Sequence, residues 1–183
     1  MKEIECRFLE IDKLALIERL SVSNATDKGE ELIEETIVYD AAATWAGQNR
    51  FIRIRKSGNT INLTYKEHRE HAVDGSYEIE LGVDDYEKAT LFLESIGFPP
   101  YRRQQKKRHT FELDGVTIDI DTWPNVPTYV ELEGESESAL RVVAKKLGFD
   151  WNTAVFHNAG WVLEKKYGIP IRTLKWFTFE RME

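Results

Sequence analysis

The sequence predicts an α+β protein in which a largely antiparallel sheet, closed or nearly closed, is flanked by helices. Two observations support this class: many short segments alternate apolar and polar residues with a period of two, and only a few segments have helical periodicity. Closure would also leave the sheet without exposed edge strands. With 183 residues and no linker-like stretch, the chain is expected to form a single domain over residues 1–183.

The N-terminal part is predicted to form a strand and then a helix. Residues 3–9 alternate in the pattern of a strand, and Asp12 is a suitable N-cap for the helix that follows. The apolar positions expected to form the buried stripe of that helix are Leu14, Leu16, Ile17 and Leu20. Cys6 is the single cysteine, which excludes an internal disulfide and a multi-cysteine zinc site. We expect it on the apolar side of the strand, with no catalytic role.

The middle of the chain is predicted to form strands and one helix. The expected strands cover residues 34–40, 50–56, 60–66 and 76–81. The second and third of these would form a hairpin around residues 57–59, which would bring Arg53, Arg55 and Lys66 near one another. A helix is expected from about Asp84 to Gly97, before a pair of prolines.

The C-terminal half is predicted to add further strands and to end in helices. The expected strands cover residues 105–113, 116–121 and 128–133. Two prolines in the loop 123–127 exclude ordinary ladder pairing there. Helices are expected over residues 136–147 and 153–167, because each apolar pattern ends at a glycine. The part from 136 to 183 is therefore expected to be mainly helical.

Charged residues recur two apart inside apolar strand frames. The frames are Glu3-Ile-Glu5-Cys-Arg7, Arg53-Ile-Arg55, Glu78-Ile-Glu80, Asp119-Ile-Asp121 and Glu131-Leu-Glu133. Successive strand side chains point to opposite faces, so each frame puts its charges on one face and its apolar residues on the other. In the strand 105–113, the same alternation separates one basic set from another. The first set is Lys106, Arg108 and Thr110, and the second is Lys107, His109 and Phe111.

The signs of these charges are sorted, with carboxylates on some strands and arginines on another. Carboxylates are hard oxygen ligands suited to Mg²⁺ or Mn²⁺, whereas guanidinium and ammonium groups suit phosphate oxygens. For any one pair, a cross-strand salt bridge on a solvated face is the better explanation. The whole set favours a site for a polyanion and its metal.

The bulk charge and the N-terminus bear on partners and location. The formal net charge of −7 and the pI of about 5.3 argue against nonspecific binding to nucleic acid. The sequence has no basic leader followed by an apolar core and no apolar run that could span a membrane. With one cysteine, these features predict a cytoplasmic protein with no nucleic-acid or membrane partner. Aromatic residues left exposed near the C-terminus would suit a homodimer contact.

With these motifs the chain resembles the CYTH superfamily, also called the triphosphate tunnel metalloenzymes, over roughly residues 1–147. The motifs that carry the resemblance are Glu3-x-Glu5-x-Arg7, Arg53-Ile54-Arg55, Leu63-Thr64-Tyr65-Lys66, Glu78-x-Glu80, Lys106-Lys107-Arg108 and Glu131-x-Glu133. The family groups class IV adenylyl cyclases with thiamine triphosphatases and inorganic triphosphatases. The resemblance implies an eight-stranded antiparallel β-barrel that forms a triphosphate tunnel with flanking helices. Residues 136–183 are a candidate to close one mouth of that tunnel.

The resemblance also implies roles for particular residues. The metal-binding residues it implies are Glu3, Glu5, Asp119, Glu131 and Glu133, with Mg²⁺ or Mn²⁺ as the cofactor. The phosphate-binding residues it implies are Arg7, Arg53, Arg55, Lys66 and Arg108, with Lys106 on the same face as a further candidate. Glu78 and Glu80 match a supporting acidic pair. The catalytic roles would fall to Glu3, Glu5, Arg7 and Lys66.

Two positions depart from the family pattern. The N-terminal motif normally ends in lysine, but here Arg7 takes that place, which keeps the charge and replaces a point charge with a planar fork. Ala41 follows the Tyr39-Asp40 motif where a hydroxyl residue is common.

The expected function is divalent-metal-dependent hydrolysis of an organic or inorganic triphosphate, with ATP, tripolyphosphate or thiamine triphosphate as the substrate. The alternative is a class IV adenylyl cyclase that converts ATP to cyclic AMP and pyrophosphate. A third reading is a noncatalytic binder of polyphosphate or nucleotide. Because no residue set identifies an adenine pocket, hydrolysis is the preferred prediction.

Overall fold

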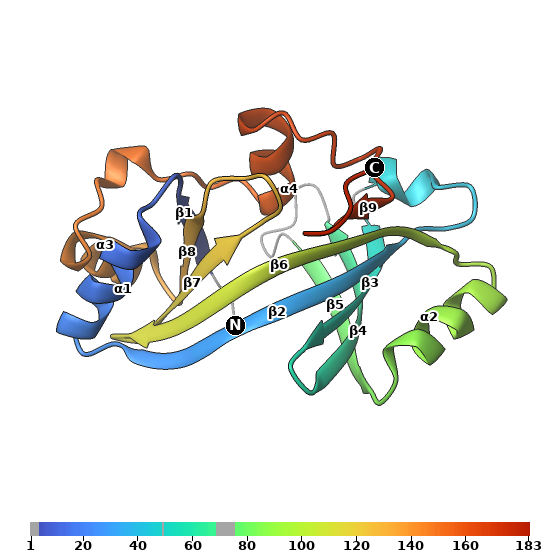
Figure 1. Cartoon of the computed structure of the whole chain (residues 1–183), viewed down its shortest axis with the longest axis horizontal. Coiled ribbons are helices and arrows are strands. Elements are labelled where there is room, and N and C mark those ends of the chain that lie inside the picture. The colour runs from blue at the N-terminus through green and yellow to red at the C-terminus, as the bar shows by residue number, and fades with distance from the viewer. Residues whose placement is uncertain (1–3, 49, 69–75) are drawn as a thin grey trace. The chain divides into compact units, whose positions relative to one another are not determined.

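The computed structural model describes residues 4–48, 50–68 and 76–183. The chain forms two compact units (Figure 1). Unit 1 comprises Met1–Glu31 and Lys107–Arg172, and unit 2 comprises Leu32–Lys106 and Thr173–Glu183. Two long strands, β2 (Thr26–Val38) and β6 (Pro100–Leu113), contribute residues to both units.

Unit 1 combines strands with helices. Besides its parts of β2 and β6, it contains β1 (Ile4–Phe8), α1 (Lys13–Val22), β7 (Val116–Thr122), β8 (Tyr129–Gly134) and α3 (Glu137–Lys146). Its strand order is β1-β8-β7-β6-β2, and the β1–β8, β8–β7 and β7–β6 ladders are antiparallel. Three short helical pieces follow: a 3-10 turn (Trp151–Thr153), α4 (Ala159–Trp161) and the π-helical η3 (Val162–Lys166).

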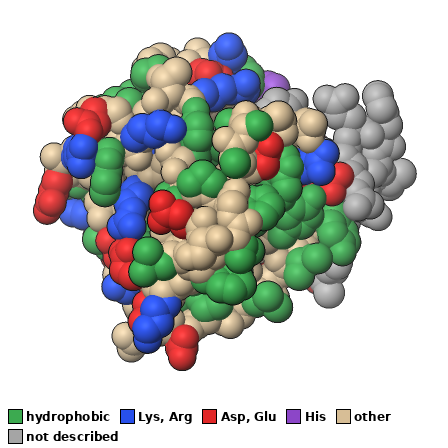
Figure 2. All heavy atoms as spheres, turned by 90° about the vertical axis from the view of Figure 1, so that its right-hand side faces the viewer, with side chains coloured by type: hydrophobic (Ala, Val, Ile, Leu, Met, Phe, Trp, Pro, Cys, Tyr) green, Lys and Arg blue, Asp and Glu red, His purple; other side chains and the backbone are tan. Residues whose placement is uncertain are grey.

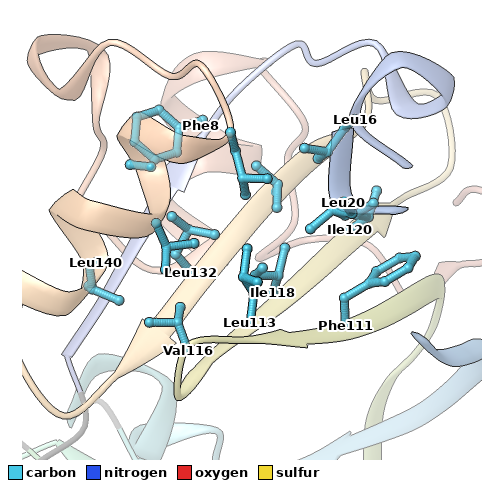
Figure 3. Packing of buried hydrophobic residues seen from close by; sticks show 14 of the residues in the cluster. Phe8, Leu16, Leu20, Phe111, Leu113, Val116, Ile118, Ile120, Leu132 and Leu140 are labelled. Atoms are coloured by element: carbon cyan, nitrogen blue, oxygen red, sulfur yellow. The ribbon is translucent and has the colours of Figure 1, made fainter. Parts of the chain in front are cut away.

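The apolar faces of these strands form a hydrophobic core. Figure 3 shows Ile118 and Ile120 of β7 and Leu132 of β8 among the side chains of that core. The helices contribute Leu16 and Leu20 from α1 and Leu140, Val143 and Ala144 from α3. Cys6 lies in this core and is fully buried, which confirms its predicted side of the strand. Burial raises the pKa of the Cys6 thiol to about 12, so this thiol is not a nucleophile at neutral pH.

The predicted helix boundaries are partly confirmed. Asp12 caps α1 by accepting a hydrogen bond from the Ala15 amide at 3.0 Å. The prediction for Leu14 was wrong, since its side chain is 79% exposed while Leu16 and Leu20 supply the buried contacts.

The predicted helix over residues 153–167 was also wrong in its first half. Val155 donates its amide proton to the Arg7 carbonyl at 2.9 Å and accepts from the Arg7 amide at 2.8 Å. These backbone groups are committed to a β-bridge and cannot form a helical ladder. Helix α4 begins only after Asn158, whose side chain accepts from the Trp161 amide at 2.9 Å.

Unit 2 contains a meander of strands with one helix. Besides its parts of β2 and β6, it contains a 3-10 turn (Thr44–Gln48), β3 (Arg50–Ser57), β4 (Thr60–His68), β5 (Ser76–Val83), α2 (Tyr86–Ser95) and β9 (Trp176–Phe177). Its strand order is β6-β2-β3-β4-β5, with β9 parallel to β6. The β3–β4 hairpin has the predicted position, and its turn contains Gly58 at a positive φ of 54°.

Unit 2 also contains a hydrophobic cluster of buried residues. It is built on Val38, Ile54 and Leu93, with further apolar residues packed against them. The large apolar side chains that α2 and β5 leave exposed are Leu91, Phe92, Ile96, Tyr77, Ile79 and Leu81. The face of the molecule drawn in Figure 2 carries a gathering of hydrophobic side chains with charged ones around it.

The prediction of a closed or nearly closed sheet is confirmed only in part, because hydrogen bonds do not close the sheet in the part of the chain that the structure describes. The hydrogen-bonded strand order runs from β1 to β5 without returning, so these ladders do not close a barrel. Alternation requires only that one face of each strand be covered, and α1, α3 and α2 meet this requirement. The α+β class and the mainly antiparallel pairing are confirmed. No helix in the described residues has the length and apolar character needed to cross a membrane.

Candidate functional site

Unit 1 carries one charged sheet face. In its antiparallel ladders Glu5 lies opposite Glu133, Arg7 opposite Glu131, and Asp119 opposite Glu131. Directly opposed residues share a face of the sheet, so these side chains lie on the side away from the apolar core. We call this set the acidic face; its members are Glu5, Asp119, Asp121, Glu131 and Glu133, with Arg7 and Arg108 among them.

Three carboxylates of the acidic face could hold a cation. Oxygens of Glu5, Glu131 and Glu133 all lie within 4.8 Å of one another. The side chain of Glu5 is 43% exposed and that of Glu131 is 8% exposed, so the group is reachable from one side. Because hard carboxylate oxygens are the donors that Mg²⁺ and Mn²⁺ prefer, these residues fit such an ion. Asp119 lies outside this trio, and Glu3 lies outside the described residues.

Arg108 is enclosed by carboxylates. Its guanidinium pairs with Asp119 at 2.5 Å, with Asp121 at 2.7 Å and with Glu131 at 3.5 Å. Burial by itself would lower the pKa of Arg108, but the charge of Asp121 and the hydrogen bonds to it raise that pKa well above its usual value. The sequence predicts Arg108 as a phosphate ligand; in this structure its donors are engaged by acids.

Asp119 shows the opposite balance. Burial raises the pKa of Asp119, while Arg108 and the Thr110 hydroxyl, which donates a hydrogen bond at 2.6 Å, act to lower it. The net direction is upward, so burial outweighs pairing at this carboxyl group.

Arg7 is buried, with 3% of its side chain exposed, and is held from two directions. Its Nη2 atom pairs with Glu131 at 2.5 Å and with Glu5 at 3.1 Å, and its Nη1 atom donates to the backbone carbonyl of His157 at 2.6 Å. Burial lowers the pKa of Arg7, but Glu131 and Glu5 outweigh it and leave the pKa raised. Arg7 therefore stays protonated. It can donate hydrogen bonds but cannot give up its proton as a general acid.

Unit 2 carries the second charged sheet face. Arg55 lies opposite Glu35 and Asn62, Arg53 lies opposite Thr64, and Lys66 lies opposite Glu78. We call this set the basic face; its cations are Arg53, Arg55 and Lys66, its acids are Glu35, Glu78 and Glu80, and the β6 side chains of Arg102, Gln104 and Lys106 adjoin Glu35. The strand alternation thus brings together the basic residues that the sequence predicts in this unit.

Glu35 is the anion at the centre of the basic face. It accepts from Arg55 Nε at 2.6 Å and from Gln104 Nε2 at 2.5 Å, and Arg53 lies 3.8 Å away. Burial would raise the pKa of Glu35, but the charges of Arg55, Arg53 and Lys106 lower it to about 2. Glu35 is therefore ionised throughout the physiological range and fixes the two arginines.

The remaining acids of the basic face hold other polar groups. Lys66 pairs with Glu78, while Glu80 accepts from the Thr64 hydroxyl at 3.0 Å and from the Asn62 amide at 2.9 Å. The supporting role that the resemblance implies for this acidic pair stays a prediction. Arg102 Nε donates to Gln104 Oε1 at 2.8 Å, which orients the Gln104 amide towards Glu35.

Two residues of these faces were missed as site residues. Asp121 is fully buried against Arg108, and the signal was its place two residues after Asp119. Glu35 stands two residues from Ile33 and from Ile37, so the alternation puts it on the same face as those buried residues. A carboxylate in a buried frame requires partners, and this is the signal that could have identified it.

Comparison with known proteins identifies the family. The CYTH domain model matches residues 1–154, and the chain belongs to the CYTH family. This confirms the resemblance drawn from the charged strand frames. No curated protein matches the sequence.

Several solved structures share the fold. A conserved hypothetical protein from Pyrococcus furiosus is 24% identical, with 86% of this chain and 97% of that chain covered and a TM-score of 0.68. A protein from Vibrio parahaemolyticus named a putative adenylate cyclase is 13% identical, with coverages of 90% and 98% and a TM-score of 0.73. A protein from Hippeastrum named a putative adenylyl cyclase, for which a dominant triphosphatase activity is reported, is 15% identical, with coverages of 93% and 98% and a TM-score of 0.64.

Proposed function

We propose that this protein is a divalent-metal-dependent phosphohydrolase that acts on an organic or inorganic triphosphate. The observation that carries the proposal is the sorting of charge by unit. The acidic face of unit 1 holds five carboxylates against two guanidiniums, and the basic face of unit 2 gathers cations around Glu35. Membership of the CYTH family supports the same chemistry.

The acidic face would hold the metal. Glu5, Glu131 and Glu133 supply the oxygens, and Glu3 is the further ligand that the sequence predicts. A bound Mg²⁺ or Mn²⁺ would act as a Lewis acid that neutralises charge on phosphate oxygens. Asp119 and Asp121 would keep Arg108 in place beside Glu131.

The basic face would bind the triphosphate. Arg53 and Arg55 present guanidiniums that match phosphate oxygens, and their positions are set by Glu35. Lys66 supplies an ammonium group that Glu78 orients, and Lys106 is a further phosphate-binding candidate. Fixed cations of this kind stabilise the charge that develops on a transferring phosphoryl group.

An adenylyl cyclase is the second candidate, because three of the matching structures carry that name. Cyclisation uses the ribose hydroxyl of ATP as the nucleophile and releases pyrophosphate, whereas hydrolysis uses water and releases orthophosphate. The triphosphatase activity reported for the Hippeastrum protein favours hydrolysis as the first proposal for a shared fold.

Product analysis tests the proposal. Purified protein would be given ATP, tripolyphosphate and thiamine triphosphate, each with Mg²⁺ and then Mn²⁺, and orthophosphate, pyrophosphate and cyclic AMP would be separated. We expect metal-dependent orthophosphate release. Cyclic AMP with pyrophosphate would establish the cyclase instead, and tight triphosphate binding without turnover would establish a noncatalytic binder.

A matched pair of variants links turnover to the acidic face. Glu133→Gln should abolish metal-dependent turnover, because it removes one charge of the proposed metal site. Glu112→Gln is the control, since this exposed residue of β6 pairs with Lys28 at 2.9 Å and does not belong to the carboxylate trio. Equal turnover in the two variants would contradict the metal site.

Two further expectations stay proposals: a homodimer and a cytoplasmic location. The large apolar side chains of α2, its C-cap Ile96 and β5 are 43–62% exposed, and exposed apolar residues of this kind suit a contact between two copies of the chain. Light scattering on the purified protein would give the mass of a dimer, and Phe92→Asp should reduce it to that of a monomer. A monomeric wild-type protein would contradict the homodimer.

A further inference from the structure

The feature that the proposed function leaves unused is the connection between Arg7 and the segment that follows α3. Residues 155–157, which we call the strap, run beside β1 as a single antiparallel bridge. The backbone of Arg7 exchanges two hydrogen bonds with Val155, at 2.8 and 2.9 Å. The same residue reaches the strap a second time, through Nη1 and the His157 carbonyl at 2.6 Å.

The other arm of the guanidinium contacts the proposed metal ligands. Nη2 lies 3.1 Å from a Glu5 oxygen and 2.5 Å from a Glu131 oxygen, so one nitrogen bridges two members of the carboxylate trio. The Nε atom is buried without a hydrogen-bond partner among the described residues and is closed to solvent. Each nitrogen of the Arg7 guanidinium is therefore engaged or buried, and only 3% of the side chain is exposed to an incoming phosphate group.

A planar fork is suited to this arrangement. Its two terminal nitrogens lie at fixed angles, so one can bridge carboxylates on the sheet face while the other reaches the strap. A lysine has a single ammonium nitrogen and cannot hold both directions with the same geometry.

We propose that Arg7 is a positioning residue that ties the strap to Glu5 and Glu131 and thereby sets the spacing of the metal-binding carboxylates, and that it does not bind phosphate. The inference rests on the proposed function for its metal and refines the role that the family resemblance gives to this position. The donors that orient metal ligands commonly matter for affinity, and their removal costs about 10–100-fold.

The first test measures binding and not turnover. The variant Arg7→Lys would be titrated with Mn²⁺ in the absence of any triphosphate, and with tripolyphosphate in the absence of metal. We expect Mn²⁺ affinity to fall by about 10–100-fold, because Glu5 and Glu131 lose their shared donor. The tripolyphosphate affinity should change by less than about threefold, because a substitution that removes no contact with the ligand usually has only a small energetic effect.

Amide hydrogen exchange supplies a second readout in the same variant. The Val155 amide should exchange at least about tenfold faster in Arg7→Lys, because the strap loses the contact with Nη1. Arg55→Lys is the matched control on the basic face. It should leave Mn²⁺ affinity and Val155 exchange unchanged and weaken tripolyphosphate binding.

A variant of the strap tests the connection without changing Arg7 or any carboxylate. Val155→Pro removes the amide proton that the Arg7 carbonyl accepts. Ala154 has φ −63° and ψ 134°, which a residue before proline adopts readily. We expect a loss of Mn²⁺ affinity with tripolyphosphate affinity retained, and this variant decides the question if Arg7→Lys does not fold.

The outcomes separate this inference from the proposed function. A tenfold or larger loss of tripolyphosphate affinity in Arg7→Lys, with Mn²⁺ affinity and Val155 exchange unchanged, would make Arg7 a phosphate ligand and overturn the inference. Unchanged Mn²⁺ affinity in Val155→Pro would overturn the role of the strap. Weakened Mn²⁺ binding in Arg7→Lys by a protein that turns over no triphosphate would support the inference while the proposed function fails. Absence of Mn²⁺ binding in the unaltered protein would overturn both.

Discussion

The charged faces of unit 1 and unit 2 are built from the same strand alternation but distribute their charges differently. In unit 1, Arg108 is surrounded by three carboxylates. In unit 2, Glu35 is surrounded by arginines and Gln104. Each unit thus holds a minority charge inside a majority of the opposite sign.

The two minority charges have opposite consequences for ligands. In unit 1, oxygens of Glu5, Glu131 and Glu133 lie within 4.8 Å of one another, and hard oxygen donors so grouped suit a metal ion. In unit 2, Glu35 holds Arg53 and Arg55 through their Nε atoms, and guanidinium groups held in place in this way suit an anion. The pKa directions agree with this contrast, because the pKa of Asp119 is raised by burial whereas that of Glu35 is lowered to about 2 by its cations.

The largest expected effect comes from removing Arg108 from the acidic face of unit 1. Arg108→Gln should lower the free energy of unfolding by about 3–5 kcal/mol, because it leaves the buried carboxylates without their common partner. Denaturant unfolding would measure it. Lys146→Gln, which breaks an exposed pair with Asp114, should cost no more than about 1 kcal/mol. Similar losses in both variants would show that Arg108 does not hold the acidic face together.

The next effect comes from removing the charge of Glu35 from the basic face of unit 2. The folded-state pKa of Glu35 is lowered from 4.5 to about 2, so its contribution to stability is complete above about pH 4.5 and is lost as the pH falls through about 2. The shift corresponds to about 3 kcal/mol at neutral pH. Glu35→Gln should therefore be less stable at pH 7, and the difference from the unaltered protein should shrink as the pH falls below 4.5.

Glu34→Gln is the control for this pH dependence, because its side chain is 38% exposed and its ion pair with Lys56 is long, at 3.6 Å. A pH profile of unfolding that is the same for both variants would contradict the central role of Glu35.

A smaller effect is expected on anion binding. Arg55→Ala should weaken tripolyphosphate binding by about 1.5–3 kcal/mol, which is tenfold or more, because a charge-assisted hydrogen bond is lost. Orthophosphate binding should weaken less, since a single phosphate engages fewer cations. Calorimetric titration would compare both ligands with Lys56→Ala, whose side chain is 46% exposed. Equal losses for the two ligands would contradict a basic face that binds a triphosphate.

The smallest effect tests whether the two units unfold together. We propose a single cooperative domain, so thermal unfolding should show one transition. Asp12 caps α1 in unit 1, and Asp85 caps α2 in unit 2 by accepting from the Lys88 amide at 2.9 Å. Asp12→Ala and Asp85→Ala should each shift that one transition down by a few degrees. Two transitions, each shifted by only one of the variants, would show that the units are separate domains.

The composition of each face could be predicted from local alternation. Strand geometry determines the side on which each residue lies. A period of two therefore assigned the correct sides to three pairs: Glu5 and Arg7, Arg53 and Arg55, and Glu131 and Glu133. Burial of Cys6 followed from the same rule.

The errors concern features that local pattern does not specify. Leu14 fits a helical stripe, but burial depends on which side of α1 meets the strands. The early part of β2 escaped prediction because its residues are exposed and carry no apolar alternation. Residues 154–158 were predicted to be helical, yet the bridge between Val155 and Arg7 uses the backbone groups that a helix would need.

The order of residues along each strand was enough to establish that this chain has charged and apolar faces, and which side chains belong to each. Only tertiary structure decided the partners: Arg108 with its three acids, Glu35 with Arg55 and Gln104, and Arg7 with the carbonyl of His157. The reason is distance along the chain. Arg7 and His157 are separated by 150 residues, and no local periodicity can report a contact between groups that meet only when the strands and the strap have packed.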